Sequence, residues 1–252
     1  MEEWLECGII KPSMSEWSFP CLLVPKKGTT KKRLVVDFRQ LNMQSELPSY
    51  PLIDIDEFLC DLGSHKSMYY TTLDLKNAYL QVPLTERSQK LCSFVCSSGQ
   101  YSFLRAPFGL NALPLAFARL IDEVLRGIKH KFTQSFIDDI LVYSKTFVEH
   151  LEHIAIVLQR LRDAGLTVEP RKTHIAKKEL VFIGFKFSKN GVKTDPSNID
   201  KVEKFPTPKN VRDVRSFLGL CNYYRRFIKS YADTARPLNQ HLNDQQMPMM
   251  PF

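Results

Sequence analysis

The chain has 252 residues, 44% of them hydrophobic, which suits a folded protein with a substantial core and excludes a disordered chain. Its apolar stretches are too short to cross a bilayer and its N-terminus MEEWLECGII is acidic, so we expect an intracellular protein, cytoplasmic or nuclear, that is neither secreted nor membrane-bound. The net charge is +8, and residues 151–252 hold 18 Lys and Arg against 10 Asp and Glu, which favours a polyanionic partner over a merely soluble basic surface.

The six cysteines are scattered without any C-x-x-C pair, so we expect reduced thiols. A metal site at Cys92 and Cys96 is the alternative. It lacks the second pair or nearby histidine that a tetrahedral zinc site needs.

The N-terminal half alternates between strand and helix patterns. CLLVPKK and LVVDF predict two strands of a β-hairpin around the turn KKGTTKKR, and MYYTTLDL at 68–75 predicts another strand. Between Pro114 and Gly127, apolar residues recur at helical spacing, with proline at the start and glycine at the end. This segment is therefore predicted to be an amphipathic helix.

The segment SFIDDILVYS at 135–144 places two adjacent carboxylates among β-formers, where Asp is depleted and a buried charge is costly. A surface turn, a salt bridge or a divalent cation could compensate them. After this segment, a capping box at 146–149 begins a predicted helix that ends at Gly165.

The C-terminal part continues the alternation. VFIGFKF has strand character, FPTPKN at 205–210 indicates a boundary, residues 211–228 are helical, and the tail QQMPMMPF is expected to be unstructured. Strands mixed with helices and hairpins predict an α+β fold, a sheet with helices packed on one side.

A third carboxylate, Asp74, ends the strand at 68–75 amid apolar neighbours. Successive strand residues point to opposite faces, so Asp138 and Asp139 can serve one site only if they lie at a hairpin turn. If that turn lies beside the end of the Asp74 strand, three carboxylates come together. They would repel one another unless a divalent cation neutralised them, and oxygen ligands suit Mg²⁺ or Mn²⁺.

Taken in order, the motifs GIIKPSMSEW, LVVDFRQLN, LDLKNAYLQV, APFGL, FIDDILVYS, FIGF, SFLGLCNYYRRFI and ARPL cover nearly the whole chain. With them the sequence resembles the reverse transcriptase domain of gypsy-type long-terminal-repeat retrotransposons and, more distantly, of retroviruses. The resemblance implies a right-hand polymerase fold. Residues 1–205 would form fingers and palm, with an antiparallel sheet and helices on one face, and residues 206–252 a partial helical thumb or connection segment with a disordered tail.

The resemblance also assigns residues to the chemistry. Asp74, Asp138 and Asp139 match the catalytic palm carboxylates that hold two Mg²⁺ or Mn²⁺ ions. Lys26 and Arg33 match the residues that grip the triphosphate of the incoming nucleotide. The alternative for this basic hairpin is a solvated loop tip.

Two aromatic residues match the nucleotide pocket of the family. Tyr79 corresponds to the residue under the sugar of the incoming nucleotide, and Phe108 to one that lines the same pocket. Judged alone, both would more often be core aromatics.

Two further segments match the contacts of the family with primer and template. The hairpin that holds the primer end corresponds to Phe182, Ile183, Gly184 and Phe185. Arg215, Gly219 and Tyr223 lie on one helical face, which the family uses to follow the minor groove. A mid-helix glycine costs about 1 kcal/mol relative to alanine, so it needs a reason; tight helix packing is the alternative.

The implied function is an RNA-directed, and also DNA-directed, DNA polymerase that adds dNTPs to a primer 3′-hydroxyl on an RNA or DNA template. In a full-length element, ribonuclease H and integrase domains of the Pol polyprotein would accompany this domain; the present sequence does not contain them. The alternative is a catalytically inactive remnant that only binds nucleic acid.

Overall fold

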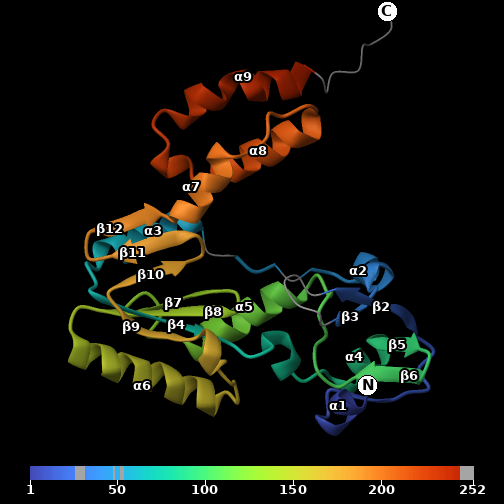
Figure 1. Ribbon diagram of the computed structural model, residues 1–252. Helices are drawn as coiled ribbons and strands as arrows, with labels where there is room; N and C mark the ends of the chain where they lie inside the picture. The colour runs from blue at the N-terminus through green and yellow to red at the C-terminus, as the bar shows by residue number, and fades with distance from the viewer. Residues whose placement is uncertain (26–31, 48, 52–53, 245–252) are drawn as a thin grey trace, which may run out of the picture. The chain divides into compact units, whose positions relative to one another are not determined.

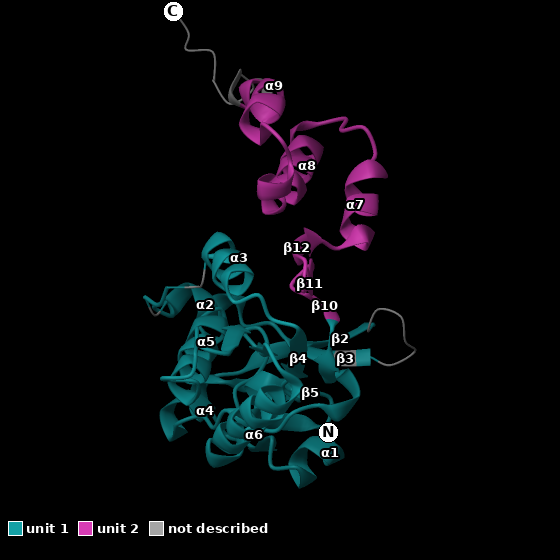
Figure 2. Cartoon of the chain, turned by 90° about the vertical axis from the view of Figure 1, so that its left-hand side faces the viewer, with its two compact units in different colours: residues 1–178 teal, residues 179–252 magenta. Residues whose placement is uncertain are grey.

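The computed structural model describes residues 1–25, 32–47, 49–51 and 54–244. The chain forms two compact units, residues 1–178 and 179–252 (Figure 2). Most of the predicted KKGTTKKR turn and the whole QQMPMMPF tail lie outside the described residues.

The first unit contains a five-stranded sheet near the N-terminus. Its strand order is β1 (Ile10–Pro12), β6 (Gly99–Phe103), β5 (Ser93–Cys96), β2 (Phe19–Pro25) and β3 (Lys32–Val36). β2 and β3 pair antiparallel, which confirms the predicted hairpin, whereas β2 and β5 pair in parallel. The buried aromatics Phe19, Phe38, Phe94 and Phe103 form its core. Short helices accompany this sheet: α1 (Glu2–Glu6), α2 (Arg39–Gln44) and α4 (Glu86–Leu91).

A second, four-stranded antiparallel sheet follows in the same unit. Its order is β7 (Thr133–Phe136), β8 (Asp139–Ser144), β4 (Tyr69–Asp74) and β9 (His174–Lys177) (Figure 1). Leu73, Ile140 and Val142 share one face and pack against α5 (Leu113–Val124) and α6 (Phe147–Asp163). Because side chains alternate along a strand, Asp74 and Asp139 face the other side. The helix α3 (Ile55–Ser64) precedes β4, and the 3₁₀ segments η1 (Ala78–Gln81) and η2 (Pro170–Lys172) flank the sheet.

The predicted helix signals act as expected. α5 has a proline in its first turn. The Thr146 side chain accepts from the Glu149 backbone N–H, and the Glu149 side chain accepts from the Thr146 backbone N–H, a complete capping box at the start of α6.

The second unit contains a sheet of β10 (Glu179–Phe182), β11 (Phe185–Ser188) and β12 (Gly191–Thr194), followed by α7 (Pro196–Glu203), α8 (Val211–Tyr223), η3 (Arg225–Phe227) and α9 (Tyr231–Asp244). VFIGFKF is therefore a hairpin, because positive φ angles at Ile183 (44°) and Gly184 (81°) reverse the chain between β10 and β11. FPTPKN joins α7 to α8.

The predicted α+β class is confirmed. The two compact units divide between Lys178 and Glu179. The functional boundary predicted after residue 205 stays a prediction. Among the helices that the structure describes, none is both long and apolar enough to span a membrane.

A buried polar chain connects α6 to the sheet. His150 is completely buried, and its two ring nitrogens lie 2.8 Å from the hydroxyls of Thr71 on β4 and Ser144 on β8. Burial, with a smaller effect from His153, lowers the pKa of His150 to about 4. His150 is therefore a neutral hydrogen-bonding residue at neutral pH.

We expect acid to destabilise the fold through His150. Its pKa of about 4 lies below the ordinary value of 6.5, so the unfolded chain binds the proton first and stability falls as the pH drops through this window. The loss should reach roughly 1–3 kcal/mol. Urea unfolding at several pH values measures it.

The control for this experiment separates His150 from the other acid-sensitive groups. His150→Gln should flatten the pH dependence, whereas His174→Gln, at an exposed position of β9, should leave it as in the wild type. Identical pH profiles for the two variants would contradict the interpretation.

Candidate active site

The register of β4 against β8 brings two of the predicted carboxylates together. Asp74 lies directly opposite Asp139 in the ladder, on the sheet face away from α5 and α6. Phe136 also pairs with Asp139, which leaves Ile137 and Asp138 as a two-residue turn. Asp74, Asp138 and Asp139 thus gather at one end of the sheet, in the arrangement that the sequence predicts.

The turn itself is strained. Ile137 has a φ of 56°, a conformation that two-residue hairpins require at their first central position but that β-branched residues rarely adopt. Such strain costs about 1–3 kcal/mol and persists only when surrounding structure holds it.

The electrostatics of the site reflect its crowded carboxylates. Burial, together with the negative charges of Asp138 and Asp74, raises the pKa of Asp139 to about 6, while the positive charge of Lys172 opposes this rise. Asp138 is exposed to water. Asp74 forms an ion pair with Lys172, whose Nζ lies 3.2 Å from both carboxylate oxygens.

Lys172 was not predicted from the sequence. It lies 98 residues from Asp74, and η2 reaches the site because Leu75 and Val168 form a β-bridge and the Glu169 N–H donates to the Asp74 carbonyl. No local pattern around Lys172 signals this long-range pairing.

Gln81 was also missed. Its side-chain Nε2 donates to the carbonyls of Lys76 and Thr167, and its Oε1 accepts from the Thr167 N–H at 2.6 Å. This side chain ties η1 to the segment that leads into η2, so it fixes the local frame around Asp74.

The three carboxylates at the end of the sheet are candidate ligands for a metal ion. In the part of the chain that the structure describes, no group of three or more His, Cys, Asp or Glu side chains is placed to hold a metal ion. The donor set nevertheless fits a hard divalent cation in kind, because it consists of carboxylate oxygens. Burial and the repulsion among these carboxylates raise the pKa of Asp139. Asp74 would have to exchange Lys172 for the cation.

Tyr79 lies in η1, five residues after Asp74. Its ring centroid is 5.4 Å from that of Phe108 and 5.5 Å from that of Phe117, which belongs to the core. Burial raises the pKa of Tyr79, with a further contribution from the charge of Asp138. The ring is thus half-buried against the core and close enough to the carboxylates to feel their charge.

The structure gives little information on two of the predicted nucleotide-binding residues, Lys26 and Arg33. Lys26 lies outside the described residues. The backbone of Arg33 belongs to β3, where it pairs with Val24 of β2. Their role stays a prediction.

In the predicted primer-binding hairpin, the turn residues Ile183 and Gly184 are more accessible than the two Phe side chains. Phe182 and Phe185 are buried, so only the turn of Ile183 and Gly184 is available for contact. Tyr223 of α8 donates from Oη to the Ile183 carbonyl at 2.7 Å. Gly184 is required twice over, by its φ of 81° and because a Cβ there would lie 2.8 Å from the Tyr224 Oη.

The predicted face of α8 is open. Arg215, Gly219 and Tyr223 are all exposed, and no described atom outside the helix's own neighbourhood lies within 4 Å of a Cβ built on Gly219. Tight helix packing within the described chain therefore does not explain Gly219, and its contact with a duplex stays a prediction.

Comparison with known proteins identifies the family. Residues 24–187 match the family model described as reverse transcriptase (RNA-dependent DNA polymerase). The chain belongs to the reverse transcriptase family. The resemblance inferred from the sequence motifs is thereby confirmed.

The relatives are longer polyproteins of transposons. The chain is 40% identical over 247 residues to the retrovirus-related Pol polyprotein from transposon gypsy of Drosophila melanogaster, covering 96% of this chain and 24% of that protein. It is 34% identical over 242 residues to the transposon Tf2-3 polyprotein of Schizosaccharomyces pombe, covering 96% of this chain and 18% of the relative. The chain thus spans a quarter or less of these relatives.

Solved structures share the fold. The foamy viral protease-reverse transcriptase dRH in complex with double-stranded DNA matches with a TM-score of 0.82 at 26% identity, covering 94% of this chain and 41% of that one. The foamy viral protease-reverse transcriptase in complex with an RNA/DNA hybrid matches with a TM-score of 0.79 at 26% identity, covering 96% and 32%. Members of the family generally use divalent metal ions.

We expect the neighbouring charges to move the pKa of Asp139 in opposite directions. Asp138→Asn removes a negative neighbour and should lower it, whereas Lys172→Met removes a positive neighbour and should raise it above about 6. Carboxyl ¹³C NMR titration measures both. Asp163→Asn, at the end of α6, is the control and should leave it unchanged. A shift of the same sign in both variants would refute this description of the site.

Proposed function

We propose that this chain carries the RNA-directed DNA polymerase activity of a retrotransposon Pol polyprotein, also able to copy DNA, with fingers and palm in residues 1–205 and a partial thumb in 206–252. The observation that carries the proposal is the pairing of Asp74 with Asp139 beside the Asp138 turn, on the sheet face opposite α5 and α6. Membership of the reverse transcriptase family supports it.

In this proposal Asp74, Asp138 and Asp139 would hold two divalent cations, Mg²⁺ or Mn²⁺. Such ions, when bound, stabilise the attacking 3′-oxygen and the leaving oxygen of an in-line phosphoryl transfer. The protein's own part is to hold the carboxylates in register across the ladder. Asp74 would have to release the Lys172 ammonium group to take part in holding such an ion.

The incoming dNTP would lie against Tyr79 and Phe108. The packed rings of these residues form a rigid wall, since Tyr79 is held from behind by Phe117. A rigid wall can exclude a 2′-hydroxyl by sterics alone. Lys26 and Arg33 are proposed to grip the triphosphate, one as a point charge and the other as a bidentate fork.

Primer and template would be held by the second unit. The Ile183–Gly184 backbone is proposed to contact the primer end, supported from beneath by Phe182 and Phe185. Arg215, Gly219 and Tyr223 are proposed to follow the minor groove of the duplex. The open face of α8 and the duplexes bound to foamy viral reverse transcriptases support this assignment. Ribonuclease H and integrase domains would be partners within a full polyprotein.

The proposal is tested by primer extension on an RNA template with and without Mg²⁺. Asp138→Asn should reduce extension at least about a hundredfold and leave duplex binding nearly unchanged, because it removes a metal ligand with little change in volume. Glu152→Gln, an exposed carboxylate on α6, is the matched control and should extend like the wild type.

Two outcomes would count against the proposal. A wild-type chain that binds duplexes but never extends a primer would be an inactive nucleic-acid-binding remnant. Loss of duplex binding together with activity in Asp138→Asn would make Asp138 a structural residue.

Sugar choice gives a second test. Tyr79→Val should raise the efficiency of ribonucleotide relative to deoxynucleotide insertion by about tenfold, which corresponds to about 1.4 kcal/mol of relieved clash. Tyr79→Phe keeps the ring and should keep the ratio. The measurement is kcat/KM for a matched ribonucleotide and deoxynucleotide in the wild type and in both variants. If Tyr79→Val loses both activities equally, Tyr79 is a core aromatic.

A further inference from the structure

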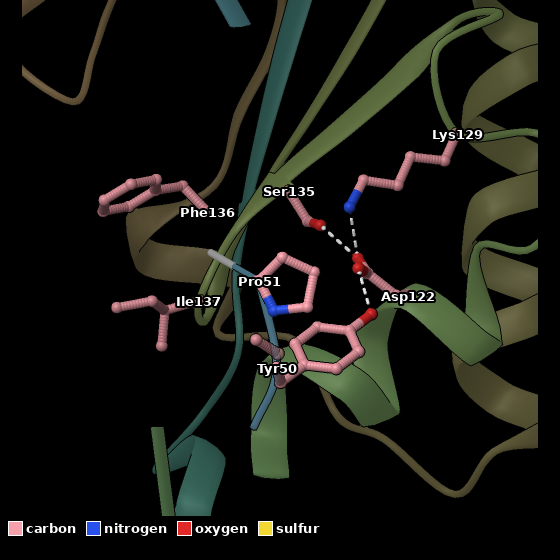
Figure 3. Close-up of a pocket in the computed structure, with 8 residues that line it drawn as sticks. Tyr50, Pro51, Asp122, Lys129, Ser135, Phe136 and Ile137 are labelled. Carbon is pink, nitrogen blue, oxygen red and sulfur yellow. Dashed lines mark hydrogen bonds and ion pairs between the residues drawn. The ribbon is translucent and has the colours of Figure 1, made fainter. Parts of the chain in front are cut away.

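A polar cluster lies behind the carboxylate turn, on the helix side of the sheet. At its centre, Asp122 of α5 accepts three hydrogen bonds (Figure 3). The Tyr50 Oη donates to Oδ2 at 2.6 Å, the Ser135 Oγ donates to Oδ1 at 3.3 Å, and the Lys129 ammonium group donates to Oδ1.

These partners come from separate parts of the chain. Tyr50 precedes α3, Lys129 lies in the connection from α5 to β7, and Ser135 belongs to β7, three residues before Asp138. One carboxylate therefore ties three segments to α5. The cluster is sheltered, because the side chains of Asp122 and Lys129 are 25% and 12% exposed and Ser135 is buried. Charge-assisted bonds in such a site are stronger than bonds in water.

The cluster borders the turn. Its side chains, together with Phe136 and Ile137, line one cavity of about 20 Å³. This is a volume for about one water molecule. Ile137 is the residue with the strained φ of 56°, and a strained turn persists only where its surroundings fix it. The ladder between β7 and β8 constrains the two ends of the turn. The Asp122 cluster holds Ser135 of β7, the strand that leads into the turn.

Tyr50 is a dependable donor in this cluster. Its hydrogen bond to Asp122 and its partial burial raise its pKa to about 12. The hydroxyl therefore stays protonated over the whole range in which polymerases work.

We propose that Asp122 is a positioning residue, which holds the Ile137–Asp138 turn in its strained conformation through β7 and so keeps the Asp138 carboxylate at the site. The consequence for catalysis rests on the polymerase function proposed above, whereas the consequence for the turn does not. Asp122 touches neither nucleotide nor primer in this account, and it acts only through the strand that leads into the turn.

The test uses the whole chain, four single variants and the double variant Asp122→Asn/Ser135→Ala. Asp122→Asn removes the charge, Ser135→Ala removes the link to β7, and Tyr50→Phe removes one hydroxyl with the least risk to folding. Glu123→Gln is the matched control, because Glu123 is the next residue on α5 and its ion pair with Arg126 is exposed. Two quantities are measured: kcat and KM for dNTP in primer extension, and amide hydrogen exchange of residues 136–139.

We expect Asp122→Asn to lower kcat about tenfold with KM changed less than about twofold, because the turn carboxylate shifts while the nucleotide wall does not. Ser135→Ala should lower kcat in the same way, and combining the two should add little, because both act through one link. Exchange at residues 136–139 should quicken in both variants relative to Glu123→Gln. Tyr50→Phe should give a smaller change of the same sign.

Unchanged exchange at residues 136–139 in a folded Asp122→Asn variant would overturn the proposal. So would a loss of activity explained entirely by a smaller folded fraction with unchanged kcat per active site. If the wild type extends no primer, the polymerase proposal fails, and the exchange measurement still decides whether Asp122 holds the turn.

Discussion

The like-charge pair across β4 and β8 governs the architecture of the site. The ladder places Asp74 directly opposite Asp139, a pairing that destabilises a sheet unless something compensates it. Three features lessen this repulsion. Lys172 forms an ion pair with Asp74, the turn leaves Asp138 exposed to water, and the pKa of Asp139 is raised. These three features reduce the repulsion between Asp74 and Asp139 but do not remove it. In the proposed function, a divalent cation bound by these carboxylates would supply the missing compensation.

The two faces of the four-stranded sheet have different roles. On one face, Leu73, Ile140 and Val142 meet α5 and α6 in a continuous apolar core, with His150 supplying a satisfied polar link. The other face carries the carboxylates. Because side chains alternate along β4 and β8, a residue of these strands that packs against the helices fixes the orientation of its neighbour on the other face. Packing on the helix side thus sets the geometry on the carboxylate side, and Asp122, which lies on the helix side, is proposed to act on the turn in this way.

Sequence patterns predicted the elements that depend on local rules. The capping box of α6, the proline start of α5 and the hairpin around Asp138 follow from short-range chemistry, and the structure contains each of them. What local patterns could not supply was long-range pairing. Lys172 reaches Asp74 only through a β-bridge between distant segments, and VFIGFKF turns into a hairpin because Ile183 adopts a positive φ that its residue type disfavours. The family resemblance groups Phe182 and Phe185 with Gly184, whereas in the structure the two Phe side chains are buried and Gly184 is only partly buried.

We propose that the Asp74–Asp139 pair forms part of a site for divalent cations. The most direct measurement is the thermal midpoint of the chain as Mg²⁺ is added, in the wild type and in Asp74→Asn, at constant ionic strength. A ligand that binds only the folded state raises the midpoint progressively with its concentration. We predict such a rise in the wild type and none in Asp74→Asn. A wild-type midpoint that does not respond to Mg²⁺, or one that responds equally in both proteins, would contradict this account.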